Sequence, residues 1–179
     1  KSAVELFMQH YYRHVMALSE VNDIILQYFQ EDIVAKKKPT MEPLNERFRL
    51  VNRRIDVVQP DIFLKNPSAM LEMFLLMAQR EENIRVRVTA IRALRDAVHL
   101  IDEEFRQNPE NCRLFLRILK APYTVVTQLT RMRRYGVLGR YLPAFGDIVG
   151  QMQHDLFHIR FVMLAGVYQQ CWENWRRNR

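Results

Sequence analysis

The sequence contains little glycine and proline, with five glycines and seven prolines among 179 residues. Folds built from many short strands and tight turns use both residues heavily, so this composition disfavours a turn-rich β-sandwich. Nine methionines and 49% hydrophobic residues, together with many leucines and arginines, favour helices instead. A chain of this length buries roughly 70% of its unfolded surface, so it can form a core without covalent or metal cross-links.

Cysteines and long apolar runs are also scarce. Cys112 and Cys171 stand far apart and match no ligand or redox motif, which is typical of a reducing compartment. No run approaches the ~20 apolar residues that a membrane-spanning helix needs. We therefore predict a cytoplasmic protein with no membrane partner. A helical pattern begins immediately after Lys1, so we expect the chain to be a piece of a longer protein.

The charge is positive, with 27 basic and 20 acidic residues giving a net charge of +7. Such a charge suits a nucleic acid, a nucleotide or an acidic protein without selecting among them. The candidate basic patch comprises Arg131, Arg133, Arg134 and Arg140, with Tyr135 and Tyr141 beside two of them. Cations mixed with aromatic rings can hold phosphates and stack bases. Because acidic residues are interspersed along the chain, we favour solvent exposure or a domain contact over nucleic-acid binding.

Apolar residues at three- and four-residue steps predict a long helix from Ala3 to about Val34. Its apolar positions are Val4, Met8, Tyr11, Val15, Leu18, Ile25 and Phe29. Such a helix is either the spine of a bundle or a rod between domains. Further helices are predicted over residues 67–80, 89–107, 109–120 and 122–135. The alternating segment "RFRLVNRRIDVV" predicts a short β-hairpin or an extended excursion near residues 47–58. We therefore predict an all-α fold, a single multi-helix bundle with this small hairpin as its one exception.

The segment "VGQMQHDLFHI" carries the pattern closest to a metal site. His154 and His158 are four residues apart, so a helix would place them on one face. Asp155 would point about 100° away from His154, and a usable site needs a third or fourth ligand. The alternative is that both histidines bond to neighbouring elements. We keep His154, Asp155 and His158 as candidates for a metal site or an interdomain contact.

Other catalytic signatures are missing from the sequence. The glycines are not spaced as a phosphate-binding loop, no serine or cysteine occupies a nucleophile elbow, and no paired-cysteine zinc motif occurs. We therefore assign no catalytic residue, no metal-ligand set and no cofactor to this chain.

Four segments, in this order, resemble the bacterial bifunctional uridylyltransferase/uridylyl-removing enzymes. They are "YYRHVMALSEVNDIILQYF", "NERFRLVNRRIDVVQPDIFLKNPSAMLEMF", "CRLFLRIL" and "YGVLGRYLPAFGDIVGQMQHDLFHI". The resemblance covers about Val4 to Ile159 and stops at Arg160. It implies a domain of helical-connector type over residues 1–159, followed by a divergent C-terminal helical tail over residues 160–179.

The resemblance also implies where catalysis occurs in such enzymes. A nucleotidyltransferase domain would precede the connector, and a phosphohydrolase domain of HD type, then two ligand-sensing domains, would follow it. The His-Asp pair of the HD domain would lie further on, in a Phe-His-Asp-Ile-Ala-Lys context, so His154-Asp155 only resembles it. The parent enzyme would use Mg²⁺ or another divalent metal, while this chain would hold none.

The function implied by the resemblance is regulatory. The parent family transfers a uridylyl group from UTP to the nitrogen-regulatory PII protein, and removes it again. Since this chain lacks both catalytic motifs, we expect a catalytically silent scaffold. Its partners would be the flanking nucleotidyltransferase and HD domains and, indirectly, PII. Two alternatives are a residual HD-type metal-dependent phosphohydrolase and a basic module that binds nucleic acid or an acidic partner.

Overall fold

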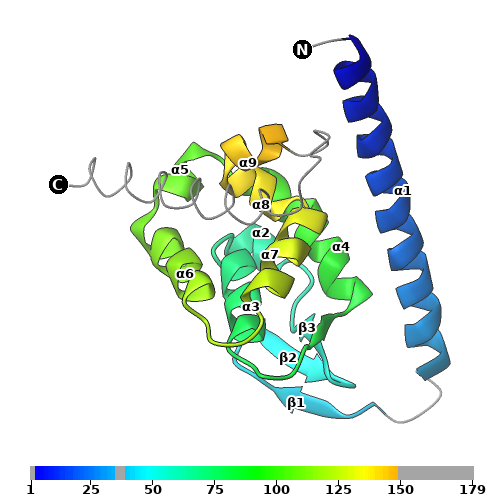
Figure 1. Cartoon of the computed structure of the whole chain (residues 1–179). Helices are drawn as coiled ribbons and strands as arrows, with labels where there is room; N and C mark the ends of the chain where they lie inside the picture. The colour runs from blue at the N-terminus through cyan, green and yellow to red at the C-terminus, as the bar shows by residue number, and fades with distance from the viewer. Residues whose placement is uncertain (1–2, 35–38, 149–179) are drawn as a thin grey trace.

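The computed structural model describes residues 3–34 and 39–148 and shows a long helix beside a mixed body (Figure 1). The helix is α1 (Ala3–Val34). The strands are β1 (Met41–Pro43), β2 (Phe48–Val51), β3 (Arg54–Val57) and β4 (Arg85–Val86). The other helices are α2 (Ile62–Lys65), α3 (Ala69–Ala78), α4 (Val88–Ala97), the 3-10 helix η1 (Val98–Leu100), α5 (Glu103–Gln107), α6 (Pro109–Leu119), α7 (Val125–Arg134), α8 (Val137–Tyr141) and α9 (Pro143–Ile148).

The prediction of an all-α fold is wrong, because the described residues include a four-stranded mixed sheet in the order β1-β2-β3-β4. The predicted hairpin is present as the antiparallel pair β2–β3, with Phe48 opposite Val57. β1 extends it antiparallel, and β4 joins β3 in parallel. Strands of two and three residues are too short to show an alternating pattern, and β4 lies far from β3 in the sequence. The pairing therefore leaves no periodic signal in the sequence.

The core lies between the sheet and the helices, with α3 at its centre. Eight of the ten α3 residues are buried, and the helix contacts α6 and α7. The fully buried residues from the sheet and α3 include Phe48, Ile55, Met70, Leu71, Phe74 and Met77. Burying each large apolar side chain contributes about 1.5–3 kcal/mol. The strands and the helices thus pack against one shared apolar core.

Three helix boundaries show how local chemistry shapes the body. Asn108 caps α6, with its Oδ1 accepting a bond from the Glu110 amide at 2.8 Å, as its place before Pro109 suggests. The single helix expected over 89–107 is instead divided into α4, η1 and α5. The reason is Asp102, whose Oδ1 accepts a 2.9 Å bond from the Phe105 amide and starts a new helix there. Gly136 follows α7 with φ +79°, as expected for a C-terminal glycine.

The C-terminal half of α1 attaches to the body, and its N-terminal turns extend past it (Figure 1). The Gln27 side-chain amide donates to the Val86 carbonyl, and Ile24 packs against the core. The Arg92 guanidinium lies over the Tyr28 ring, 5.9 Å from its centroid. The long helix predicted from Ala3 to Val34 is therefore confirmed. Within residues 3–34 and 39–148, no helix has the length and apolar content to cross a membrane.

Candidate functional site

The histidine pair singled out in the sequence falls outside the structural description. His154, Asp155 and His158 are beyond residue 148, so their role as metal or interdomain contacts stays a prediction. In the described part of the chain, no group of three or more His, Cys, Asp or Glu side chains is arranged to hold a metal ion. The basic residues are therefore the remaining candidates for a functional site.

Arg131 on α7 is a tether rather than a freely exposed cation. Its Nη2 donates to Asn83 Oδ1 at 2.8 Å, and its Nη1 donates to the Ile84 carbonyl at 2.5 Å. These bonds join α7 to the segment that leads into β4. Burial lowers the pKa of Arg131, and the charges of Arg85 and Arg134 lower it further, while Tyr135 acts in the opposite direction. Several guanidinium groups therefore lie within electrostatic range of one another at the start of β4.

The structure distributes the remaining residues of the predicted basic patch over two elements. Arg133 and Arg134 are on α7 near Arg131, half-buried and exposed respectively. Arg140 is exposed on α8, where its backbone carbonyl accepts a bond from Arg106 Nη1 of α5 at 3.2 Å. The patch thus has one part beside β4 and one part beside α5.

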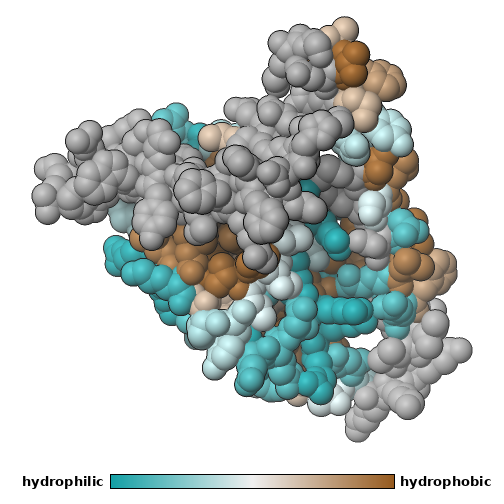
Figure 2. Space-filling view, viewed as in Figure 1, coloured by the Kyte–Doolittle hydropathy of each residue, from teal (hydrophilic) through white to brown (hydrophobic). Residues whose placement is uncertain are grey.

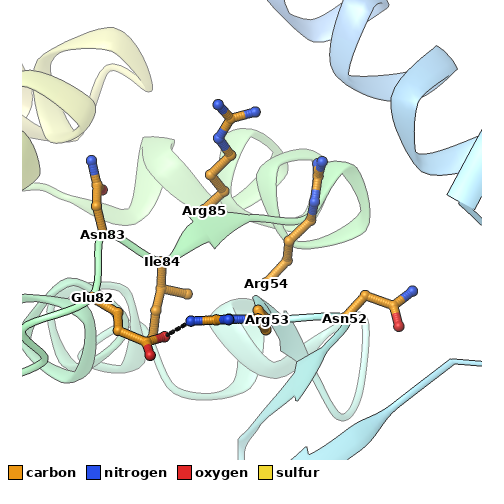
Figure 3. A pocket seen from close by; sticks show the side chains of 7 residues that line it. All are labelled: Asn52, Arg53, Arg54, Glu82, Asn83, Ile84 and Arg85. Carbon is orange, nitrogen blue, oxygen red and sulfur yellow. Dashed lines mark ion pairs between the residues drawn. The ribbon is translucent and has the colours of Figure 1, made fainter.

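A polar pocket lies where the β2–β3 turn meets the segment before β4 (Figure 3). It has a volume of about 300 Å³ and is lined by Asn52, Arg53, Arg54, Glu82, Asn83, Ile84 and Arg85. The three arginines outnumber the single glutamate, so the lining carries positive charge. No spacing in the sequence predicts this site. Its one local signal is the pair of adjacent arginines after Asn52, and only the sheet order brings Arg85 to them.

One ion pair crosses the pocket. Arg53 Nη2 lies 2.6 Å from Glu82 Oε2, and both side chains are largely exposed (Figure 3). The hydrogen bond and charge of Glu82 raise the pKa of Arg53. Exposed pairs of this kind contribute little to stability, because water already solvates both groups.

A second pocket of about 200 Å³ differs in its charge balance. Its charged lining consists of Arg47 and Arg117 against Glu72 and Glu110. Arg47 is already paired with Glu72, with Nε and Oε2 at 2.8 Å. Two positive and two negative residues give this pocket no net preference for an anion. The pocket at the start of β4 is therefore the stronger candidate site.

The buried carboxylate of Asp56, on β3, holds the sheet to α4. Asp56 Oδ2 lies 3.0 Å from Arg87 Nη1 and 3.5 Å from Arg49 Nη2, while its Oδ1 accepts a 2.5 Å bond from Thr89 Oγ1. The Asp56 side chain is only 3% exposed. Because these partners satisfy the carboxylate, we interpret the cluster as structural support for β3.

Comparisons with known proteins match the part of the chain that contains the sheet, the pocket and α7. The family described as "Uridylyltransferase GlnD third domain" matches residues 48–141, which include the pocket and the basic residues of α7 and α8. Bifunctional uridylyltransferase/uridylyl-removing enzymes of Pseudomonas aeruginosa, Pseudomonas entomophila and Pseudomonas putida are 54%, 52% and 51% identical to this chain over 160 residues. Each match covers 89% of this chain and 18% of the relative. No solved structure matches the chain.

Proposed function

Because the chain belongs to the GlnD uridylyltransferase family, within which it matches the third domain, we propose that it is a non-catalytic helical scaffold of a longer enzyme. That enzyme would transfer a uridylyl group to the PII protein and remove it, using Mg²⁺ or another divalent metal held by other domains. Flanking nucleotidyltransferase and HD domains would be the direct partners of this scaffold, and PII an indirect one. The setting would be the cytoplasm, and this chain would itself carry no cofactor.

The observation that carries this proposal is the apolar surface of α1. Val4, Phe7 and Leu18 are 71%, 68% and 70% exposed. Other exposed apolar side chains on this helix are Leu6, Tyr11, Tyr12, Val15, Val21, Ile25, Leu26, Tyr28 and Phe29. Figure 2 shows hydrophobic residues along the outer side of this helix.

A helix with apolar residues over such a wide arc is normally buried by other protein. The chain spans only about 18% of the length of the relatives it matches. The remaining length of such an enzyme offers the surface that would cover α1. This arrangement supports a role in holding domains together.

The missing catalytic motifs also support the scaffold role. The transferase's glycine-serine motif and the Phe-His-Asp-Ile-Ala-Lys segment of the HD domain, both implied by the resemblance, do not occur in this sequence. Two-metal transfer and metal-activated hydrolysis each need a dedicated ligand set. The scaffold would therefore contribute positions and contacts rather than reactive groups.

The direct test is a labelling assay with the isolated chain, PII, Mg²⁺ and UTP labelled in its α-phosphate. We expect no label on PII, because the transferase motif that the resemblance implies does not occur in this sequence. The full-length Pseudomonas aeruginosa relative serves as the positive control. Transfer of label to PII by the isolated chain would show that it is catalytic and would overturn the proposal.

A further inference from the structure

A regular, mostly apolar repeat runs along the side of α1 that faces away from the body. Its members are separated by alternating steps of four and three residues, which is the spacing of a coiled-coil seam. They are Val4, Met8, Tyr11, Val15, Leu18, Asn22, Ile25 and Phe29. Ile24 and Gln27 contact the body, and they lie about 200° and 140° round the helix from Asn22. The repeat therefore lies on the hydrophobic outer side of α1 that Figure 2 shows.

Asn22 is the one polar member of this repeat. On a helix, its neighbours are the residues three and four positions away. Three of these, Leu18, Ile25 and Leu26, are exposed apolar side chains. Asn22 is itself exposed, and asparagine is a poorer helix former than alanine or leucine. Neither helix propensity nor contact with the body therefore accounts for asparagine at this position.

Asn22 stands where any partner of α1 would bury it. A surface that packs onto Leu18, Ile25 and Leu26 also covers Asn22, because Asn22 lies between them on the helix. A polar side chain that is buried without a hydrogen-bond partner is costly, so the covering surface must provide one. The step of four residues from Leu18 and of three to Ile25 makes Asn22 an a position of the repeat. A single asparagine at such a position fixes the register of the helices that pair there.

We propose that α1 pairs with a helix from the rest of the parent enzyme, and that this helix carries a polar side chain opposite Asn22 that sets their register. The proposal rests on the scaffold role of this chain. The chain spans only about 18% of the length of the relatives it matches, so most of such an enzyme lies outside it and can supply the helix. From Val4 to Phe29 the seam is about 38 Å long. A row of large side chains of this length can provide the roughly 800 Å² that each partner of a stable interface buries.

The test uses a chimera in which this chain replaces the matched 160 residues of the Pseudomonas aeruginosa relative. Asn22→Leu should lower the thermal midpoint of the chimera by a few degrees and reduce uridylylation of PII, because the polar group opposite is left buried without a partner. In the isolated chain the same substitution should not lower the midpoint, since Asn22 is exposed there. An unchanged or raised midpoint in the chimera would overturn the proposal. A lower midpoint in the isolated chain would also overturn it, because Asn22 would then serve the body itself.

His10→Leu is the matched control, because it also replaces an exposed polar side chain of α1 with leucine. His10 lies about 120° round the helix from Asn22, outside the seam, so this variant should behave like the unmodified chimera. Equal lowering of the midpoint by the two substitutions would mean that added apolar surface is responsible, and would overturn the proposal.

Leu18→Asp in the same chimera separates this inference from the scaffold role. If Leu18→Asp lowers the midpoint and Asn22→Leu does not, α1 is covered by other protein but its register is not set at Asn22. That result would overturn this inference and leave the scaffold role intact. Tolerance of both substitutions would contradict the scaffold role as well.

Discussion

At the scale of single residues, replacing Asp56 should strongly lower the stability of the fold. Its buried carboxylate contacts Arg49 of β2, Arg87 in the connection from β4 to α4, and Thr89 of α4. Removing one partner of a buried ion pair costs about 3–5 kcal/mol. The two arginine side chains are 28% and 36% exposed, so water can partly solvate them once the carboxylate is gone.

We therefore predict that Asp56→Ala lowers the free energy of unfolding by about 3 kcal/mol, at the lower end of the range for broken buried pairs. Urea denaturation followed by circular dichroism measures this change. Asp61→Ala is the control, because the Asp61–Lys65 pair, at 2.7 Å, is exposed and joins only the residue before α2 to the last residue of that helix, so it should matter little. Equal stability of the two variants would show that the buried network does not hold β3 to α4.

Arg131 shows why a sequence pattern can locate a residue without giving its contacts. Its place in a basic, tyrosine-containing stretch suggests phosphate binding or solvent exposure. In the structure its guanidinium satisfies the Ile84 carbonyl and the Asn83 side chain, which come from a distant segment. The residue type fits both roles, and only the tertiary contact distinguishes them.

At the scale of single elements, the β2–β3 turn sets an unfavourable backbone conformation at Arg53 against the Arg53–Glu82 ion pair. Glycine is better suited than arginine to the left-handed conformation at position 53. Arg53→Gly should therefore raise the midpoint of thermal unfolding by a few degrees. Differential scanning calorimetry measures this change. A lower midpoint would show that the Arg53–Glu82 pair outweighs the backbone cost, against our reasoning.

The elements that the sequence predicted share a strong local signal. α1, α3, α6 and α7 each combine an apolar period with nearby end signals, and the β2–β3 hairpin alternates around Asn52-Arg53. β1 and β4 were missed because strands of three and two residues are too short to show an alternating apolar pattern. The break at Asp102 was missed because the apolar stripe of Ile91, Leu94, Val98 and Ile101 runs up to it, and Phe105, four residues after Ile101, continues the same spacing. A cap can interrupt a helix that the apolar pattern alone would continue.

The candidate pocket was beyond prediction for a related reason. Arg54 and Arg85 become neighbours only through the parallel pairing of β3 with β4. Such a contact depends on the topology of the whole sheet, and a single sequence contains no spacing that signals it. The family resemblance, by contrast, rests on long matching segments, and the match to residues 48–141 confirms it.

At the scale of the whole molecule, the account depends on α1 being an interface. In the isolated chain Leu18 is 70% exposed, so Leu18→Asp should leave its thermal midpoint nearly unchanged. In a longer enzyme that covers this helix, the same aspartate would be buried without a partner, which is costly. Ser19→Asp introduces the same charge at the next, exposed position and is the matched control.

The decisive measurement places this chain in the Pseudomonas aeruginosa relative, exchanging the matched 160 residues. Uridylylation of PII and the thermal midpoint are then compared for the unmodified chimera, Leu18→Asp and Ser19→Asp. We predict an active chimera in which Leu18→Asp lowers both the midpoint and the activity, while Ser19→Asp changes neither. An active chimera that tolerates Leu18→Asp as well as Ser19→Asp would contradict the scaffold role of α1.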